Sequence, residues 1–117
     1  MYKPRLAVVF YSFMKPIALL IKADATDTPA ALRYANALVN AGNPLVGVFF
    51  LGKGVRQAAQ LSHQDWRNLK HRSGARLMLC SASADKFNVQ GDEDFTLAGL
   101  GELITSGLHG NRVVSFG

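Results

Sequence analysis

The stretch Leu45–Leu51 reads Leu-Val-Gly-Val-Phe-Phe-Leu and contains no polar side chain. It lies between Pro44 and Gly52, two residue types that commonly bound regular elements. A short apolar run without alternation is typical of a strand that is covered on both faces, as in a parallel sheet with helices on each side. This stretch therefore predicts a buried strand of an α/β fold.

The segment before this strand predicts a helix. Asp27, Thr28 and Pro29 form a helix start, because a Thr side chain can cap free amides and Pro loses no hydrogen bond at the first helical position. Apolar residues then recur at helical spacing up to Gly42, which serves as a C-cap. These residues are Leu32, Ala35, Leu38 and Val39. Two apolar runs further upstream predict strands, namely Leu6–Phe13 and Ile17–Ile21.

Helical patterns also follow the Leu45–Leu51 run. Val55–Leu61 has helical composition, and Ser62 followed by Asp65 resembles a capping box for a second short helix that ends at Gly74. The apolar residues of this second helix are Trp66 and Leu69.

The remainder of the chain continues the alternation. Arg76–Ser81 predicts a strand, Ala82–Asp94 a polar loop, and Arg112–Phe116 a last strand. A helix is predicted between the loop and the last strand from Leu97, Leu100, Leu103, Ile104 and Leu108. Alternating strands and helices predict one three-layer α/β domain over residues 1–117, with a mostly parallel sheet of about five strands flanked by helices.

The charge pattern does not indicate a nucleic-acid-binding protein. The 117-residue chain carries a net charge of +5, but only the stretch Arg67–Arg76 is densely basic. We interpret that stretch as the solvated face of a short helix, so direct nucleic-acid binding is not expected, and contact with RNA through this positive surface is the alternative. No apolar stretch is long enough to span a bilayer, and no membrane association is expected.

A single cysteine, Cys80, excludes an internal disulfide and a cysteine-rich metal site. Nothing therefore requires an oxidising compartment, and the cytoplasm is the expected location. The apolar N-terminal region is interrupted by Lys15, Pro16 and Lys22, which does not suit a secretory signal.

Cys80 is nevertheless the candidate catalytic residue. A free cysteine is more often an inert core residue than a nucleophile. Here it lies near the carboxyl end of a predicted strand, on the edge of the sheet where α/β folds place their chemistry. We expect Cys80 to be accessible and to react as a thiolate. The helix start near Thr96 and the ammonium group of Lys86 are candidates for lowering its pKa.

Other residues that carry chemistry are interpreted as structural or solvated. The acidic run Asp92–Asp94 has no partner in the sequence pattern and is interpreted as a solvated loop. Gly99-Leu100-Gly101 lacks the third glycine and the acidic residue of a dinucleotide-binding motif. The histidines lack metal-ligand spacing, so neither a metal nor an organic cofactor is expected. They are His63, His71 and His109.

Several stretches resemble the DsrE/DsrF-like family, and within it the TusD/DsrE-type sulfurtransferase subunits. They occur in the family's order and cover roughly half of the chain. The four stretches are PAALRYANALVNAG (29–42), VFFLGKGVRQAAQL (48–61), ARLMLC (75–80) and FTLAGLGELITSGLHGNRVVSFG (95–117).

The resemblance implies a sulfur-relay protein in which Cys80 accepts sulfane sulfur as a persulfide and passes it on. It implies sulfur donor and acceptor proteins as partners, and either a homo-oligomer (trimer or hexamer) or a hetero-oligomer with related subunits. The sulfur would serve tRNA thiolation or sulfur oxidation. No metal or organic cofactor is implied.

Two features depart from the family's pattern. The segment Ser81–Asp94 is shorter than usual and lacks the family's basic, glycine-containing motif, and the region Ser62–Ser73 is also abbreviated. A non-catalytic scaffold or binding subunit with the same fold therefore remains as an alternative. The family's first strand corresponds to Ile17–Ile21, so residues 1–13 are interpreted as an N-terminal extension.

Overall fold

The computed structural model describes residues 16–24, 28–60, 63–105 and 111–117. The predicted strand Leu6–Phe13, the proposed helix cap at Ser62 and the predicted helical residue Leu108 lie outside these ranges. None of the helices in the described residues has the length and apolar character needed to cross a lipid bilayer.

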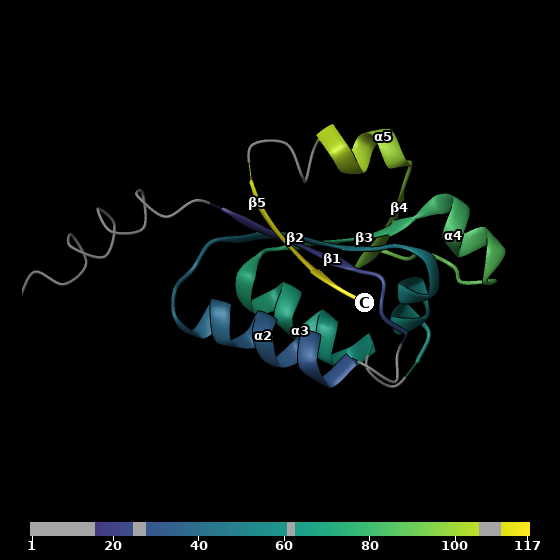
Figure 1. The fold of residues 1–117 in the computed structure, drawn as a ribbon. Coiled ribbons are helices and arrows are strands. Elements are labelled where there is room, and N and C mark those ends of the chain that lie inside the picture. The colour runs from purple at the N-terminus through teal and green to yellow at the C-terminus, as the bar shows by residue number, and fades with distance from the viewer. Residues whose placement is uncertain (1–15, 25–27, 61–62, 106–110) are drawn as a thin grey trace, which may run out of the picture.

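In the described part of the chain, five strands form one sheet with the order β4-β3-β2-β1-β5 (Figure 1). All neighbouring strands are parallel, and the register pairs Ile21 with Phe50 and Cys80 with Ala98. The strands are β1 (Ile17–Ile21), β2 (Leu45–Phe50), β3 (Arg76–Cys80), β4 (Phe95–Ala98) and β5 (Arg112–Phe116). The continuous apolar run that begins at Leu45 thus forms an inner strand, as predicted.

Helices cover both faces of this sheet. Helices α2 (Thr28–Asn40) and α3 (His63–Ser73) lie along one face, and α5 (Leu100–Leu103) lies over the other (Figure 1). The 3-10 helix η2 (Gly52–Ala58) and helix α4 (Ser81–Lys86) follow the carboxyl ends of β2 and β3. The predicted three-layer α/β architecture with a parallel sheet is confirmed.

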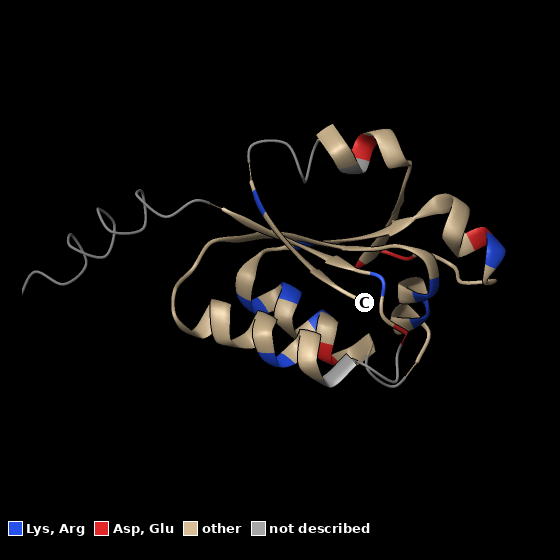
Figure 2. Cartoon of the chain, in the orientation of Figure 1, with Lys and Arg blue, Asp and Glu red and all other residues tan. Residues whose placement is uncertain are grey.

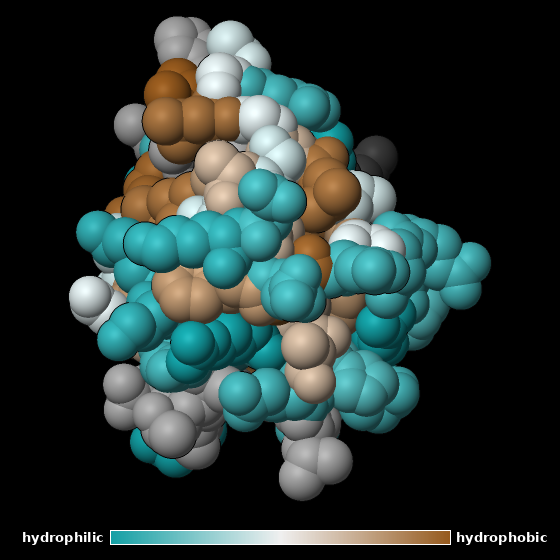
Figure 3. Space-filling model, turned by 90° about the vertical axis from the view of Figure 1, so that its right-hand side faces the viewer, coloured by the Kyte–Doolittle hydropathy of each residue, from teal (hydrophilic) through white to brown (hydrophobic). Residues whose placement is uncertain are grey.

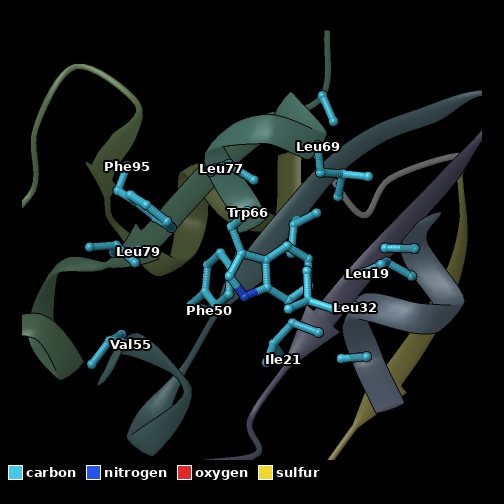
Figure 4. Packing of buried hydrophobic residues seen from close by; sticks show 14 of the residues in the cluster. Leu19, Ile21, Leu32, Phe50, Val55, Trp66, Leu69, Leu77, Leu79 and Phe95 are labelled. Atoms are coloured by element: carbon cyan, nitrogen blue, oxygen red, sulfur yellow. The ribbon is translucent and has the colours of Figure 1, made fainter. Parts of the chain in front are cut away.

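The main core lies between the sheet and the helices α2 and α3 (Figure 4). Trp66 is fully buried there, and its ring meets the Phe50 ring edge-on at a centroid distance of 5.3 Å. Its indole N–H donates to the Gln57 side-chain oxygen at 2.7 Å, and the Gln57 amide donates to the Ala23 carbonyl at 3.1 Å. This buried polar chain links α3, η2 and the end of β1.

A smaller apolar cluster occupies the other face of the sheet. It contains the side chain of Cys80 together with four neighbours, Ala18, Phe49, Met78 and Ala98. Small residues are prominent here, in contrast to the large side chains of the main core. The candidate functional residue therefore lies on the face that α5 covers.

Two elements differ from the sequence-based expectations. The predicted loop Ala82–Asp94 begins with α4, whose Ala84 is buried in the main core. The predicted helix is present at Leu100–Leu103 as α5, but Leu97, where we expected it to begin, lies in strand β4. Helix α4 gave no apolar period because it buries few side chains, and the apolar spacing was misleading at β4 because it is a four-residue edge strand.

Candidate active site around Cys80

Cys80 lies where two neighbouring strands lead into opposite layers. It ends β3 and pairs with Ala98, which ends β4. After Cys80 the chain enters α4, which packs its Ala84 into the core shared with α2 and α3. After Ala98 the chain passes to α5 on the opposite face (Figure 1). Such a divergence at the carboxyl ends of parallel strands is the place where α/β folds usually bind ligands.

The sulfur is less accessible than the sequence suggested. Cys80 is 8% exposed and packs in the cluster with Phe49 and Met78. The expectation of an openly accessible thiol is therefore wrong for the single chain. The cause is the placement of the side chain, which points toward the face covered by α5 instead of into the adjoining loop.

The local backbone places hydrogen-bond donors around this sulfur. Cys80 is the N-cap residue of α4, with an extended backbone, and the first turn of the helix contains Ala82 and Ser83. The Ser83 hydroxyl accepts a hydrogen bond from the Gly52 amide at 2.9 Å. The turn after β2 is thereby joined to the start of α4, close to Cys80.

Burial and these donors act on the thiol in opposite directions. Burial raises the pKa of Cys80, but the Ser83 hydroxyl and the amides of Ser83 and Ala82 lower it, and the net pKa lies below the ordinary value. The neutral thiol makes no capping hydrogen bond of regular geometry, so these groups act by stabilising the thiolate. The residue is thus a better nucleophile than a buried cysteine without such donors.

The two groups that we expected to lower this pKa do not do so. Thr96 lies within strand β4 and not at a helix start, and its hydroxyl donates to the Leu77 carbonyl. The Lys86 ammonium lies 5.5 Å from the centre of the Phe87 ring at the far end of α4. Ser83 takes the role that we expected of these two residues. A serine in the turn after a strand-terminal cysteine was the only sequence signal for this contact.

The acidic run is paired rather than freely solvated. Arg67 on α3 binds Asp92 at 2.6 Å and Asp94 at 2.9 Å, and Lys70 binds Asp94 at 3.2 Å. The interaction with Arg67 lowers the pKa of Asp92 to about 2. These pairs attach the segment before β4 to α3. They also mean that two residues of the dense basic stretch, Arg67 and Lys70, are paired with carboxylates. Figure 2 shows the other Lys and Arg residues spread over several elements.

An exposed apolar surface lies beside the site. Leu100 and Ile104 at α5 are 58% and 50% exposed, and Leu97 on the edge strand β4 is 52% exposed. In Figure 3 the hydrophobic residues gather in the upper part of the molecule, at the height of α5. Large apolar side chains grouped on a surface commonly mark a contact with another protein.

Comparisons with known proteins show what this chain is similar to. The chain is 31% identical over 115 aligned positions to "Sulfurtransferase TusD" from Salmonella arizonae, covering 79% of this chain and 90% of the relative. It is 31% identical over 125 positions to "Sulfurtransferase TusD" from Salmonella paratyphi B, covering 85% of this chain and 98% of the relative.

A solved structure and a family model match as well. The crystal structure of the ychN protein from E. coli superimposes with a TM-score of 0.73 at 17% identity, covering 88% of this chain and 100% of that protein. This likeness shows that the two proteins share a fold. The family described as "DsrE/DsrF-like family" matches residues 15–116. The chain belongs to the DsrE/DsrF-like family.

Proposed function

We propose that this protein is a sulfur-relay protein that carries sulfane sulfur as a persulfide on Cys80. The curated relatives named as sulfurtransferases and the family membership support the general role. The observation that carries the specific assignment is the chain's single thiol, which ends β3 where β3 and β4 lead into opposite layers and which has a lowered pKa.

The chemistry needs one thiolate and no cofactor. The Cys80 thiolate attacks the outer sulfur of a donor persulfide, a new sulfur–sulfur bond forms, and the donor leaves as a thiolate. In the second step an acceptor thiolate attacks the outer sulfur on Cys80, and Cys80 leaves as a thiolate with its electron pair. The two steps balance without an external oxidant or reductant. We propose that the transferred sulfur serves tRNA thiolation or sulfur oxidation.

Partners are required by this chemistry. A donor and an acceptor must each bring a sulfur atom to Cys80, which is 8% exposed in the single chain. We propose that they approach at the carboxyl ends of β3 and β4, between α4 and α5. The exposed side chains of Leu100 and Ile104 suit assembly with a second copy or with related subunits, as a trimer or hexamer. A cytoplasmic location fits a carrier that must keep its thiol reduced between transfers.

A second candidate function is a scaffold that carries no sulfur. The burial of Cys80 among Ala18, Phe49 and Met78 favours it, because an inert core cysteine is packed in this way. The two functions differ in whether the native protein accepts and releases sulfur.

Cold cyanolysis tests the proposal. The protein is incubated with a small-molecule persulfide, freed of excess reagent, and treated with cyanide, which removes sulfane sulfur as thiocyanate. We expect close to one thiocyanate per chain for the wild type and none for Cys80→Ala, because only the thiolate can hold the sulfur. Cys80→Ala is the matched variant, since it leaves no hydroxyl in an apolar site. Equal, negligible release from both proteins would instead support the scaffold.

A further inference from the structure

The Ser83 side chain is held in one place by a contact from a distant part of the chain. The Gly52 amide donates to its oxygen at 2.9 Å, and the two residues are 31 positions apart. The turn that carries this amide is itself fixed, because the Leu51 amide donates to the Ile21 carbonyl and the Gly54 amide to the Leu51 carbonyl, each at 2.9 Å. Gly52 adopts φ +53°, a left-handed conformation that favours glycine.

The turn packs directly against the end of β1. A Cβ atom on Gly54 would lie 2.1 Å from the Ile21 carbonyl oxygen, so η2 is in direct backbone contact with β1. The buried Gln57 side chain adds a second attachment of η2 through the Ala23 carbonyl. The Gly52 amide therefore presents a fixed donor to Ser83.

A hydroxyl group that accepts a hydrogen bond still has its own hydrogen to donate. Serine in a helix often donates this hydrogen to a carbonyl of the preceding turn. Among the hydrogen bonds between described residues, none has the Ser83 hydroxyl as its donor to a carbonyl. Ser83 is the third residue of α4 after the N-cap Cys80, so the two residues lie in the same first turn of the helix.

We propose that Ser83 is a positioning residue for Cys80: its hydroxyl, held by the Gly52 amide, donates its hydrogen to the Cys80 thiolate. The lowered pKa of the thiol agrees, since after burial, which raises the pKa, the Ser83 hydroxyl is the largest influence and lowers it. The inference rests on the proposed function only in taking Cys80 as the reacting group.

This contact matters in both transfer steps. A hydrogen-bond donor to the Cys80 sulfur increases the fraction of Cys80 that is present as thiolate and can attack the incoming persulfide. It also stabilises Cys80 as the leaving group when the acceptor takes the outer sulfur, and a thiol with a lower pKa leaves faster. Loss of the hydroxyl should therefore slow loading at neutral pH and slow release.

Thiolate absorbance in the ultraviolet, recorded against pH and referenced to Cys80→Ala, tests the proposal on the full chain. The single cysteine makes the difference spectrum specific for Cys80, and the reference removes the tyrosine signal. We expect Ser83→Ala to move the midpoint of the Cys80 thiolate titration to higher pH. We also expect it to lower the rate at which Cys80 takes up sulfur from a persulfide donor at pH 7 about fivefold. Ser81→Ala removes a neighbouring exposed hydroxyl and should leave both unchanged. Ser83→Thr retains a hydroxyl and should keep the wild-type midpoint.

Two results would overturn the proposal. One is a Ser83→Ala midpoint equal to that of the wild type. The other is a Ser83→Thr midpoint shifted as far as that of Ser83→Ala, which would assign the effect to packing. Because the titration uses no sulfur donor, it can succeed when the cyanolysis experiment fails and fail when that experiment succeeds, so the two hypotheses are judged separately.

Discussion

Replacing Trp66 with Phe tests the buried polar chain that holds η2 in place. The Trp66 side chain is fully buried, and its indole N–H donates to Gln57 at 2.7 Å. Phe retains an aromatic ring beside Phe50 but cannot donate to Gln57. The substitution therefore removes the link between α3 and η2 while conserving most of the packing.

The expected loss of stability follows from two contributions. Taking the donor away from a buried side-chain oxygen costs about 1–3 kcal/mol. The smaller ring leaves a gap in a core with no exposed surface, which adds about 1 kcal/mol. We therefore expect Trp66→Phe to lower the free energy of unfolding by about 3 kcal/mol. Gln57→Leu should cost a similar amount, because it leaves the indole N–H buried without this acceptor and removes the bond to Ala23.

Urea denaturation followed by circular dichroism measures these losses without relying on tryptophan fluorescence. In the double variant the two losses should not add, since each substitution already breaks the shared hydrogen bond, and a coupling energy of about 1 kcal/mol is expected. A Trp66→Phe loss below about 1 kcal/mol, or strictly additive losses, would contradict the assignment of this pair as a structural link.

Two further predictions concern acid stability and assembly. Because Arg67 lowers the pKa of Asp92 to about 2 in the folded protein, this pair stabilises the fold above about pH 4 and the contribution is lost as the pH falls toward 2. The Asp92 side chain is 41% exposed, so the contribution of the pair to the free energy of unfolding is about 1 kcal/mol. Urea denaturation should show that Arg67→Met loses about 1 kcal/mol less stability than the wild type between pH 4 and pH 2. An equal loss in both proteins would contradict this prediction. Light scattering at micromolar concentration should show an oligomer that Ile104→Ser weakens, whereas a monomeric wild type that recruits no related subunit would count against assembly through α5.

Much of the fold could be predicted because the inner strands are buried on both faces. Ile17–Ile21, Leu45–Phe50 and Arg76–Cys80 read as compact apolar runs, and this pattern directly reflects their central positions in the sheet. The edge strand Phe95–Ala98 was missed, since two of its four residues are exposed and its single leucine, Leu97, matches a helical spacing with the leucines that follow. Helix α4 was missed because Ser, Ala, Asp and Lys give it no apolar period.

The site was predictable only in part for a related reason. Cys80 could be placed at a strand end from the local sequence, but its burial depends on which face of the sheet its side chain meets. The Gly52–Ser83 contact joins segments 31 residues apart, and the Arg67–Asp92 pair spans 25 residues. Contacts of this kind are created by the order of the strands, and no local pattern encodes them.

The most direct measurement of the central claim is the intact mass of the native protein after exposure to a persulfide donor. A persulfide adds one sulfur atom, so a mass increase of about 32 Da is expected, and dithiothreitol should remove it by attacking the sulfur–sulfur bond. The adduct should map to the peptide that contains Cys80 and should be absent from Cys80→Ala. If native Cys80 takes up no sulfur and resists iodoacetamide while the denatured protein reacts with both, the sulfur-carrier account is wrong.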